Sequence, residues 1–158
     1  MMKNRILLVY LASLGGILAW LGAIVLAPYL RSRGNPLGKF LYFCFSPVCH
    51  QIPGRSFSTF GYPMAVCARC LGIYSGFLAG MGFYPLLRGF AELRLPKMKI
   101  FLAFSLPIVA DTAGNLLGLW ASTNVLRLAT GILWGAVLPF YFVTGLAELA
   151  SRAKKRIE

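Results

Sequence analysis

The chain has 158 residues, of which 58% are hydrophobic, and it carries a formal net charge of +12. Soluble globular domains average about 45–50% apolar residues, so this composition argues against an ordinary soluble domain. The positive charge is also a poor indication of nucleic-acid binding, because the basic residues lie between and beyond apolar blocks and form no basic helical face beside stacking aromatic residues. We therefore expect the lipid bilayer as a partner, and no nucleic acid.

Four long apolar blocks indicate transmembrane helices. A hydrocarbon layer of about 30 Å requires roughly 20 apolar residues in a helix. The first block exceeds the core of a signal peptide, about 7–15 residues, so we expect it to be retained as a span. We predict an all-α, polytopic membrane protein with one integral domain over 1–158 and four transmembrane helices, at about 6–30, 70–88, 100–120 and 126–147.

The placement of Lys and Arg predicts the orientation of these helices. With four spans, the two termini and the connection between spans two and three share one side, and they hold ten of the 16 Lys and Arg residues. Basic residues are enriched on the cytoplasmic side of membrane proteins. We expect a multi-pass plasma-membrane protein with both termini in the cytoplasm and the connection between spans one and two at the outer face.

The connection over 35–69 is too long for a simple turn. Its first part, 35–48, is aromatic and too short to cross a membrane, so we predict an interfacial or re-entrant helix that opens at Asn35 or Pro36 and closes at Pro47. The part that follows is rich in Pro and Gly, which predicts an ordered loop rather than a strand.

Small residues mark one face of the second predicted span, where Gly72, Gly76 and Gly80 recur every four residues. This spacing lets helices approach closely, and we expect a homo-oligomer through this face. In the last span, Pro139 predicts a kink, which is tolerated in membrane helices.

Three cysteines and the single histidine form the motif C-H-x16-C-x2-C, made by Cys49, His50, Cys67 and Cys70. Two thiols at i and i+3 at a helix start can chelate one metal or close a disulfide, and the helix dipole favours their thiolate form. Zinc prefers tetrahedral sulfur and nitrogen ligands, so we predict a zinc site at these four residues. Adjacent side chains diverge, so Cys44 or water could complete the shell.

Other interpretations of the cysteines stay open. In a redox protein, Cys44 would pair with Cys49 and Cys67 with Cys70 at an oxidising membrane surface. That layout is similar to four-helix membrane enzymes that pass electrons from protein dithiols to quinone, which would then be the cofactor. Alternatively, the cysteines are small buried hydrophobic residues or structural disulfides.

Polar residues inside the predicted membrane helices suggest a second site. Asp111, the only aspartate, lies near the middle of the third predicted span, where a charge costs roughly 2.5–3.5 kcal/mol and requires a partner or a wet cavity. We expect Arg127 as its partner, with Asn115 one turn from Asp111 and Thr130 beside Arg127. The group is either an ion pair that stabilises the bundle, or a catalytic set of Asp111, Asn115 and Arg127 beneath the cysteines.

The chain has only four acidic residues, so its arginines cannot all be paired internally and at least one should face an anion. As residues that bind this anion we predict Gln51, Arg55, Arg69 and Thr130.

Three segments, CHQIPGRSF, CARCLGIYSG and DTAGNLLG with STNVLRLATG, resemble a family of small prokaryotic membrane proteins known as a domain of unknown function. The family signature is similar to C-H-Q-x-P-x-R-S-F followed by C-x-R-C-x-G-x-Y, and the resemblance covers roughly 40–135. It implies a membrane location and carries no established reaction. Cys44 is not part of the signature, which weakens the interpretation with two disulfides.

These observations predict a metal site at the outer membrane face over a polar intramembrane pocket that binds or acts on an anionic amphiphile. Two alternatives remain. One is a quinone-linked thiol–disulfide oxidoreductase that uses Cys67 and Cys70. The other is a non-enzymatic membrane binding or assembly protein whose metal is structural.

Overall fold

The computed structural model describes residues 2–88 and 95–155, and most of them are helical. The fold is all-α, as predicted. The elements in chain order are α1 (Met2–Ser32), α2 (Pro36–Phe45), a 3-10 turn (Pro53–Arg55), β1 (Ser58–Thr59), β2 (Tyr62–Pro63), α3 (Ala68–Arg88), α4 (Met98–Leu116) and α5 (Asn124–Lys155).

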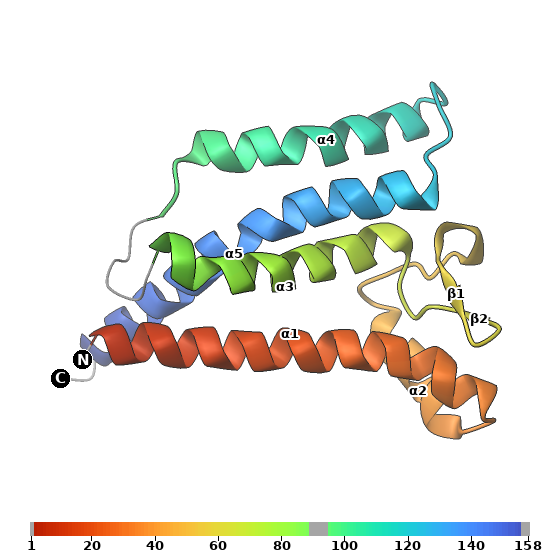
Figure 1. Ribbon diagram of the computed structural model, residues 1–158, viewed down its shortest axis with the longest axis horizontal. Coiled ribbons are helices and arrows are strands. Elements are labelled where there is room, and N and C mark those ends of the chain that lie inside the picture. Colours follow the sequence, from red (N-terminus) through yellow and green to blue (C-terminus); the bar gives the residue numbers. More distant parts are fainter. Residues whose placement is uncertain (1, 89–94, 156–158) are drawn as a thin grey trace.

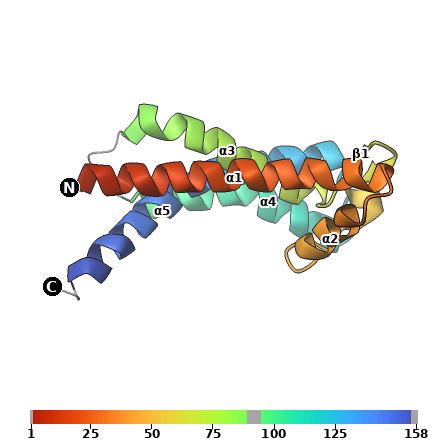
Figure 2. The same ribbon diagram turned by 90° about the horizontal axis from the view of Figure 1, so that it is seen from below.

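The four long helices α1, α3, α4 and α5 run alongside one another, each antiparallel to the one before it (Figure 1). Helices α3 and α5 make the closest contact, while α4 packs on α5 at the outside of the bundle. The start of α1 and the end of α5 lie at one end, whereas α2 and the two strands lie at the other (Figure 2). The termini and the cysteine-rich connection are therefore at opposite ends of the bundle.

In the described part of the chain, three helices are long and apolar enough to cross a membrane: Ile6–Ser32, Ala68–Leu87 and Asn124–Leu149. The span predicted at 100–120 corresponds to α4, which is not among these three. The count of four spans therefore stays a prediction. Two basic residues that enter the predicted charge bias, Arg94 and Arg156, lie outside the described residues.

Helix α4 is shorter than the third apolar block. It ends at Leu116 because Gly118 adopts a φ of +70°, a left-handed conformation that commonly terminates helices. Asp111 consequently lies in the last two turns of α4, at the end of the bundle that carries the cysteines. Asp111 is thus nearer the end of its helix than the position expected from a helix over 100–120.

Glycines explain the close contact between α3 and α5. A Cβ atom on Gly76 would lie 2.3 Å from the backbone oxygen of Ile132, and one on Gly72 would lie 2.3 Å from that of Leu128. The predicted small-residue face is therefore covered by α5 of the same chain, so a homo-oligomer through this face would have to displace α5. Helix α5 itself continues through Pro139.

The connection between α1 and α3 begins with α2, as predicted. The Asn35 side chain caps this helix by accepting a hydrogen bond of 2.9 Å from the Leu37 backbone N–H, and Pro36 follows at the first helical position. The segment after α2 differs from the prediction, because β1 and β2 form a small antiparallel hairpin there. Phe60 and Gly61 both adopt positive φ at its turn, which is the geometry of a type I′ hairpin turn.

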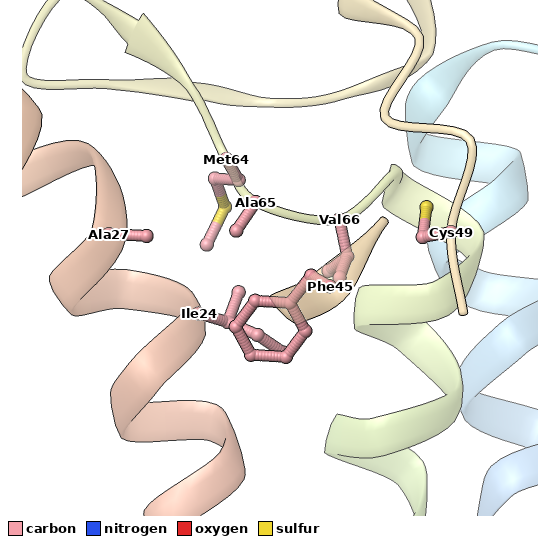
Figure 3. Close-up of a cluster of buried hydrophobic side chains, with 7 residues drawn as sticks. All are labelled: Ile24, Ala27, Phe45, Cys49, Met64, Ala65 and Val66. Atoms are coloured by element: carbon pink, nitrogen blue, oxygen red, sulfur yellow. The ribbon is translucent and has the colours of Figure 1, made fainter. Parts of the chain in front are cut away.

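A buried apolar cluster holds this connection against α1. Figure 3 shows its side chains converging from α1, from α2 and from the segment before α3, with Cys49 at the edge beside α3. Its members are Ile24, Ala27, Phe45, Cys49, Met64, Ala65 and Val66. Burial of these side chains fixes the position of Cys49 relative to the first turn of α3.

Candidate metal centre

Three cysteine sulfurs lie together at the start of α3. The Sγ atoms of Cys49, Cys67 and Cys70 are all within 4.8 Å of one another, and the thiols are free. In a tetrahedral zinc site, Zn–S bonds of about 2.3 Å place the sulfurs roughly 3.8 Å apart. The cluster could therefore hold a metal ion after small side-chain adjustments.

The start of α3 explains why Cys67 and Cys70 point to the same place. Cys67 immediately precedes the helix, its carbonyl accepts the first helical hydrogen bond from Leu71 N–H at 2.9 Å, and Cys70 follows one turn later. Residues three apart share one face of a helix. Hydrogen bonds from the Cys49 and Cys70 thiols, together with backbone N–H groups of the first turn, hold the pKa of Cys67 well below its ordinary value.

Cys49 reaches this cluster from the other end of the connection. Its sulfur accepts a hydrogen bond of 3.1 Å from the backbone N–H of Cys67. Gln51 supports this arrangement, because its Nε2 donates to the Tyr42 carbonyl at 2.7 Å and to the Ala65 carbonyl at 3.0 Å. These two bonds tie α2 to the segment before α3. The Gln51 backbone has a φ of +50°, a conformation that is uncommon outside glycine.

Two other candidate ligands lie outside the group of three sulfurs. His50 is exposed and its imidazole is not part of the group, although the residue lines the adjacent pocket. Cys44 is exposed on α2. The two-pair disulfide scheme does not match this geometry, because the Cys49 sulfur lies with Cys67 and Cys70 rather than with Cys44.

A pocket of about 240 Å³ adjoins the sulfurs. Its polar walls come from the loop after α2 and from the ends of α3, α4 and α5 that lie nearest the cysteines. The polar lining side chains, apart from the cysteines, are His50, Gln51, Arg55, Arg69, Asn115 and Arg127. Most of the predicted site residues are thus brought to one place, although they come from four separate parts of the sequence.

Arg127 is a buried cation in this pocket, with only 8% of its surface exposed. Its guanidinium Nη1 donates to the side-chain oxygen of Asn124 at 3.3 Å, and it has no carboxylate partner among residues 2–88 and 95–155. Arg55 lies at the exposed side of the pocket. The Nε atom of Arg69 is buried and has no hydrogen-bond partner within the described ranges. The pocket therefore has unused hydrogen-bond donors and an excess of positive charge.

Asp111 pairs with Arg69, so the predicted pairing with Arg127 was wrong. The Arg69 guanidinium donates to one carboxylate oxygen, and the Ser122 hydroxyl donates to the other at 2.5 Å. The early end of α4 places Asp111 beside the first turn of α3, and the chain then brings Ser122 back over it. Sequence reasoning missed Ser122 and Asn124, although the polar run Ser-Thr-Asn between two apolar blocks is a signal that could have indicated both.

Two further predicted residues have local roles in the structure. The Thr130 hydroxyl donates to the Leu126 carbonyl of its own helix at 2.9 Å, and Thr130 does not line the pocket. Asn115 lines the pocket, and its Nδ2 donates to the Trp120 carbonyl at 3.2 Å. Thr130 therefore lies outside the group that the structure brings together, whereas Asn115 belongs to it.

An all-α bundle with membrane-length apolar helices and a cluster of three thiols defines a helical membrane protein that could bind a metal ion. The chain belongs to the family described as "Predicted membrane protein (DUF2085)", whose model matches residues 49–141. The match begins at Cys49, so it includes all three sulfurs and the arginines of the pocket.

Two archaeal relatives support this assignment. An uncharacterized protein of Methanocaldococcus jannaschii is 39% identical over 146 residues, which cover 89% of this chain and 94% of that protein. An uncharacterized protein of Methanothermobacter thermautotrophicus is 36% identical over 90 residues, which cover 56% of this chain and 78% of that protein. No solved structure matches the chain.

Proposed function

We propose that this membrane protein binds a zinc ion through Cys49, Cys67 and Cys70, and binds an anionic amphiphile in the arginine-lined pocket beside that ion. One observation carries the proposal: three clustered sulfurs line the same pocket as a buried arginine that has no carboxylate partner in the described part of the chain. The metal site and the anion site would then contact the same bound ligand.

The donor set favours zinc. Soft thiolate ligands select zinc and copper(I) over magnesium, calcium or manganese, and zinc commonly takes three protein ligands with a fourth, open position. Here the fourth position would belong to water, to the nearby His50 or to the ligand itself. Bound zinc supplies Lewis-acid chemistry, so it can polarise an oxygen atom that binds at this position.

The charges around the pocket favour an anion. Three thiolates around a divalent ion leave one net negative charge, whereas Arg55 and Arg127 contribute two positive charges and Arg69 is neutralised by Asp111. Leaving a buried arginine unpaired is unfavourable, and an anion that accepts hydrogen bonds from Arg127 and from Arg69 Nε would offset that cost. In this proposal Asp111 acts through Arg69, as a positioning residue.

We further propose that the site lies at the outer face of the cell membrane. The termini and the cysteines occupy opposite ends of the bundle, and the bias of Lys and Arg favours the cytoplasm for the end with the termini. An impermeant thiol reagent applied to intact cells tests this orientation at the exposed Cys44, which lies at the same end as the cluster.

Elemental analysis combined with thiol counting on the purified protein tests the metal centre. We expect one equivalent of zinc, with three thiols protected from alkylation until the metal is chelated and Cys44 reactive throughout. Protein that contains no metal when purified with zinc present, and that carries a disulfide between Cys67 and Cys70, would overturn the proposal.

That second result would support a quinone-linked thiol–disulfide oxidoreductase. The specific observation in its favour is the lowered pKa of Cys67 at a helix start, one turn from a second thiol. Reduction of a water-soluble quinone by the dithiol form of the protein, with formation of one disulfide per quinone reduced, would then be the measurement that identifies this activity.

A further inference from the structure

A second, larger hollow lies along the bundle between α1, α3 and α5. It has a volume of about 630 Å³, and its walls are almost wholly apolar. Residues that line it include Gly16 and Trp20 of α1, Ile73 and Phe77 of α3, and Phe142 of α5. We call it the apolar groove.

The apolar groove begins beside the candidate metal centre. Ile73 lines both the groove and the pocket next to the sulfurs. Ile73 and Tyr74 follow Cys70 by one helical turn, and the Tyr74 ring packs edge-on against Trp20, with 5.8 Å between ring centroids. The head of the groove is therefore one layer of side chains away from the sulfurs.

The length of the apolar groove suits a hydrocarbon chain. Its wall on α1 extends from Leu8 to Trp20, which is roughly 18 Å at a rise of about 1.5 Å per residue. This is close to half of a hydrocarbon layer of about 30 Å. Trp20 lies near the middle of the apolar segment Ile6–Ser32, and Leu8 lies near its start. A chain that enters near Trp20 would thus run along α1 toward the end of the bundle that carries the termini.

We infer that the ligand of the arginine pocket is a long-chain lipid phosphate, whose phosphate contacts Arg127 and Arg55 and whose hydrocarbon chain lies in the apolar groove. This inference rests on the proposed function, because it names the class of amphiphile that the pocket binds. Arginine recognises phosphate by paired hydrogen bonds, and Arg55 and Arg127 in the adjoining pocket supply positive charge that would attract a phosphate head group.

The shared wall at Ile73 and the charge of the pocket favour this occupant over bulk lipid. A chain from an ordinary zwitterionic lipid could fill the apolar groove, but its head group would not neutralise Arg127, which has no carboxylate partner among the described residues, and Arg69 Nε is without a hydrogen-bond partner there. A lipid phosphate would occupy the groove and the pocket together, because its chain buries apolar surface in the groove and its head group neutralises the arginines of the pocket.

Neighbouring glycines on α1 provide a matched pair of variants to test the inference. Both Gly15 and Gly16 have open space where a Cβ would be, but only Gly16 lines the apolar groove. Gly16→Phe should fill the groove, whereas Gly15→Phe adds the same ring to another face of the helix. Ala12→Trp, also in the groove, is a second filling variant.

The experiment measures binding of dodecyl phosphate and of butyl phosphate to the zinc-loaded, full-length protein in phosphatidylcholine nanodiscs. Partitioning of dodecyl phosphate into the bilayer is the same for each variant. Differences in affinity between the variants therefore measure binding in the apolar groove. We expect Gly16→Phe and Ala12→Trp to weaken dodecyl phosphate binding at least tenfold relative to Gly15→Phe. Butyl phosphate binding and zinc content should be equal in all three.

The outcomes separate this inference from the proposed function. If butyl phosphate binds and the filling variants leave dodecyl phosphate binding unchanged, the hydrocarbon chain does not lie in the groove and the inference is overturned. If neither phosphate binds to zinc-loaded protein, the anion site of the proposed function fails as well. If a filling variant loses zinc, it has damaged the fold, and the other filling variant decides the result.

Discussion

Arg69 and Asp111 form an ion pair that joins the first turn of α3 to the last turns of α4. Arg69 lies between Cys67 and Cys70 in the sequence and lines the pocket beside the three sulfurs. The only aspartate of the chain therefore fixes the arginine that lies between these two cysteines. Through this contact, the peripheral helix α4 is tied to the candidate metal centre.

Replacing Asp111 with Asn should lower the free energy of unfolding by about 2 kcal/mol, because it leaves the Arg69 charge without its partner in a partly buried position. The measurement is chemical unfolding in detergent. In a double-mutant cycle, Asp111→Asn combined with Arg69→Gln should be less damaging than the sum of the single changes. Strictly additive effects would mean that the two side chains do not interact.

The close contact between α3 and α5 predicts that one added methyl group will destabilise the protein. Gly76→Ala would put a Cβ atom 2.3 Å from the Ile132 backbone oxygen, so the helices must separate. We expect a loss of about 2 kcal/mol in the free energy of unfolding. Gly82→Ala is the control, because that position has open space and alanine is the better helix former. Equal free energies of unfolding for Gly76→Ala and Gly82→Ala would contradict the observed packing.

The metal centre predicts different zinc contents for variants of Cys67 and of Cys44. Cys67→Ser should reduce bound zinc to a small fraction of one equivalent, since two sulfurs are insufficient to hold the ion tightly. Cys44→Ser should retain full zinc, because Cys44 lies outside the sulfur group. Metal analysis of the two purified variants checks this, and zinc loss from Cys44→Ser would show that the ligand set is wrong.

Gln51 should tune metal affinity without being a ligand. Its amide group joins the Tyr42 and Ala65 carbonyls and so keeps Cys49 near α3. Gln51→Ala removes both hydrogen bonds, and we expect zinc affinity to fall about 10-fold to 100-fold, as is usual for groups that support metal ligands. Competition with a coloured chelator measures this change. Unchanged affinity would show that the apolar cluster alone positions Cys49.

Arg127 should contribute to anion binding and little to stability. Arg127→Gln removes a buried charge that has no carboxylate partner in the described ranges, so the ligand-free protein should be no less stable than the parent. Binding of butyl phosphate should weaken about 10-fold, corresponding to the loss of about 1.4 kcal/mol from a charge-assisted contact. Lys39→Gln, which removes an exposed charge on α2, is the matched control. Destabilisation without any change in phosphate binding would assign Arg127 a structural role.

The sequence by itself determined the helices and the local motifs. Of the four apolar blocks, three coincide with helices that are apolar enough to span a membrane, and Asn35 with Pro36 predicted the start of α2. The spacing of Cys67 and Cys70 placed their sulfurs together, because residues three apart share a helix face. These features depend on residues close in the chain, where backbone geometry leaves few alternatives.

Only the tertiary structure decided which distant side chains meet. The partner of Asp111 is Arg69 rather than Arg127, because Gly118 ends α4 early and so sets which turn of α3 faces the carboxylate. The glycine face of α3 meets α5 of the same chain, and His50 stays outside the sulfur group. Such contacts depend on the residue at which each helix ends and on the rotation of each helix about its axis. The packing of helix faces against one another sets both, and no local spacing in the sequence encodes them.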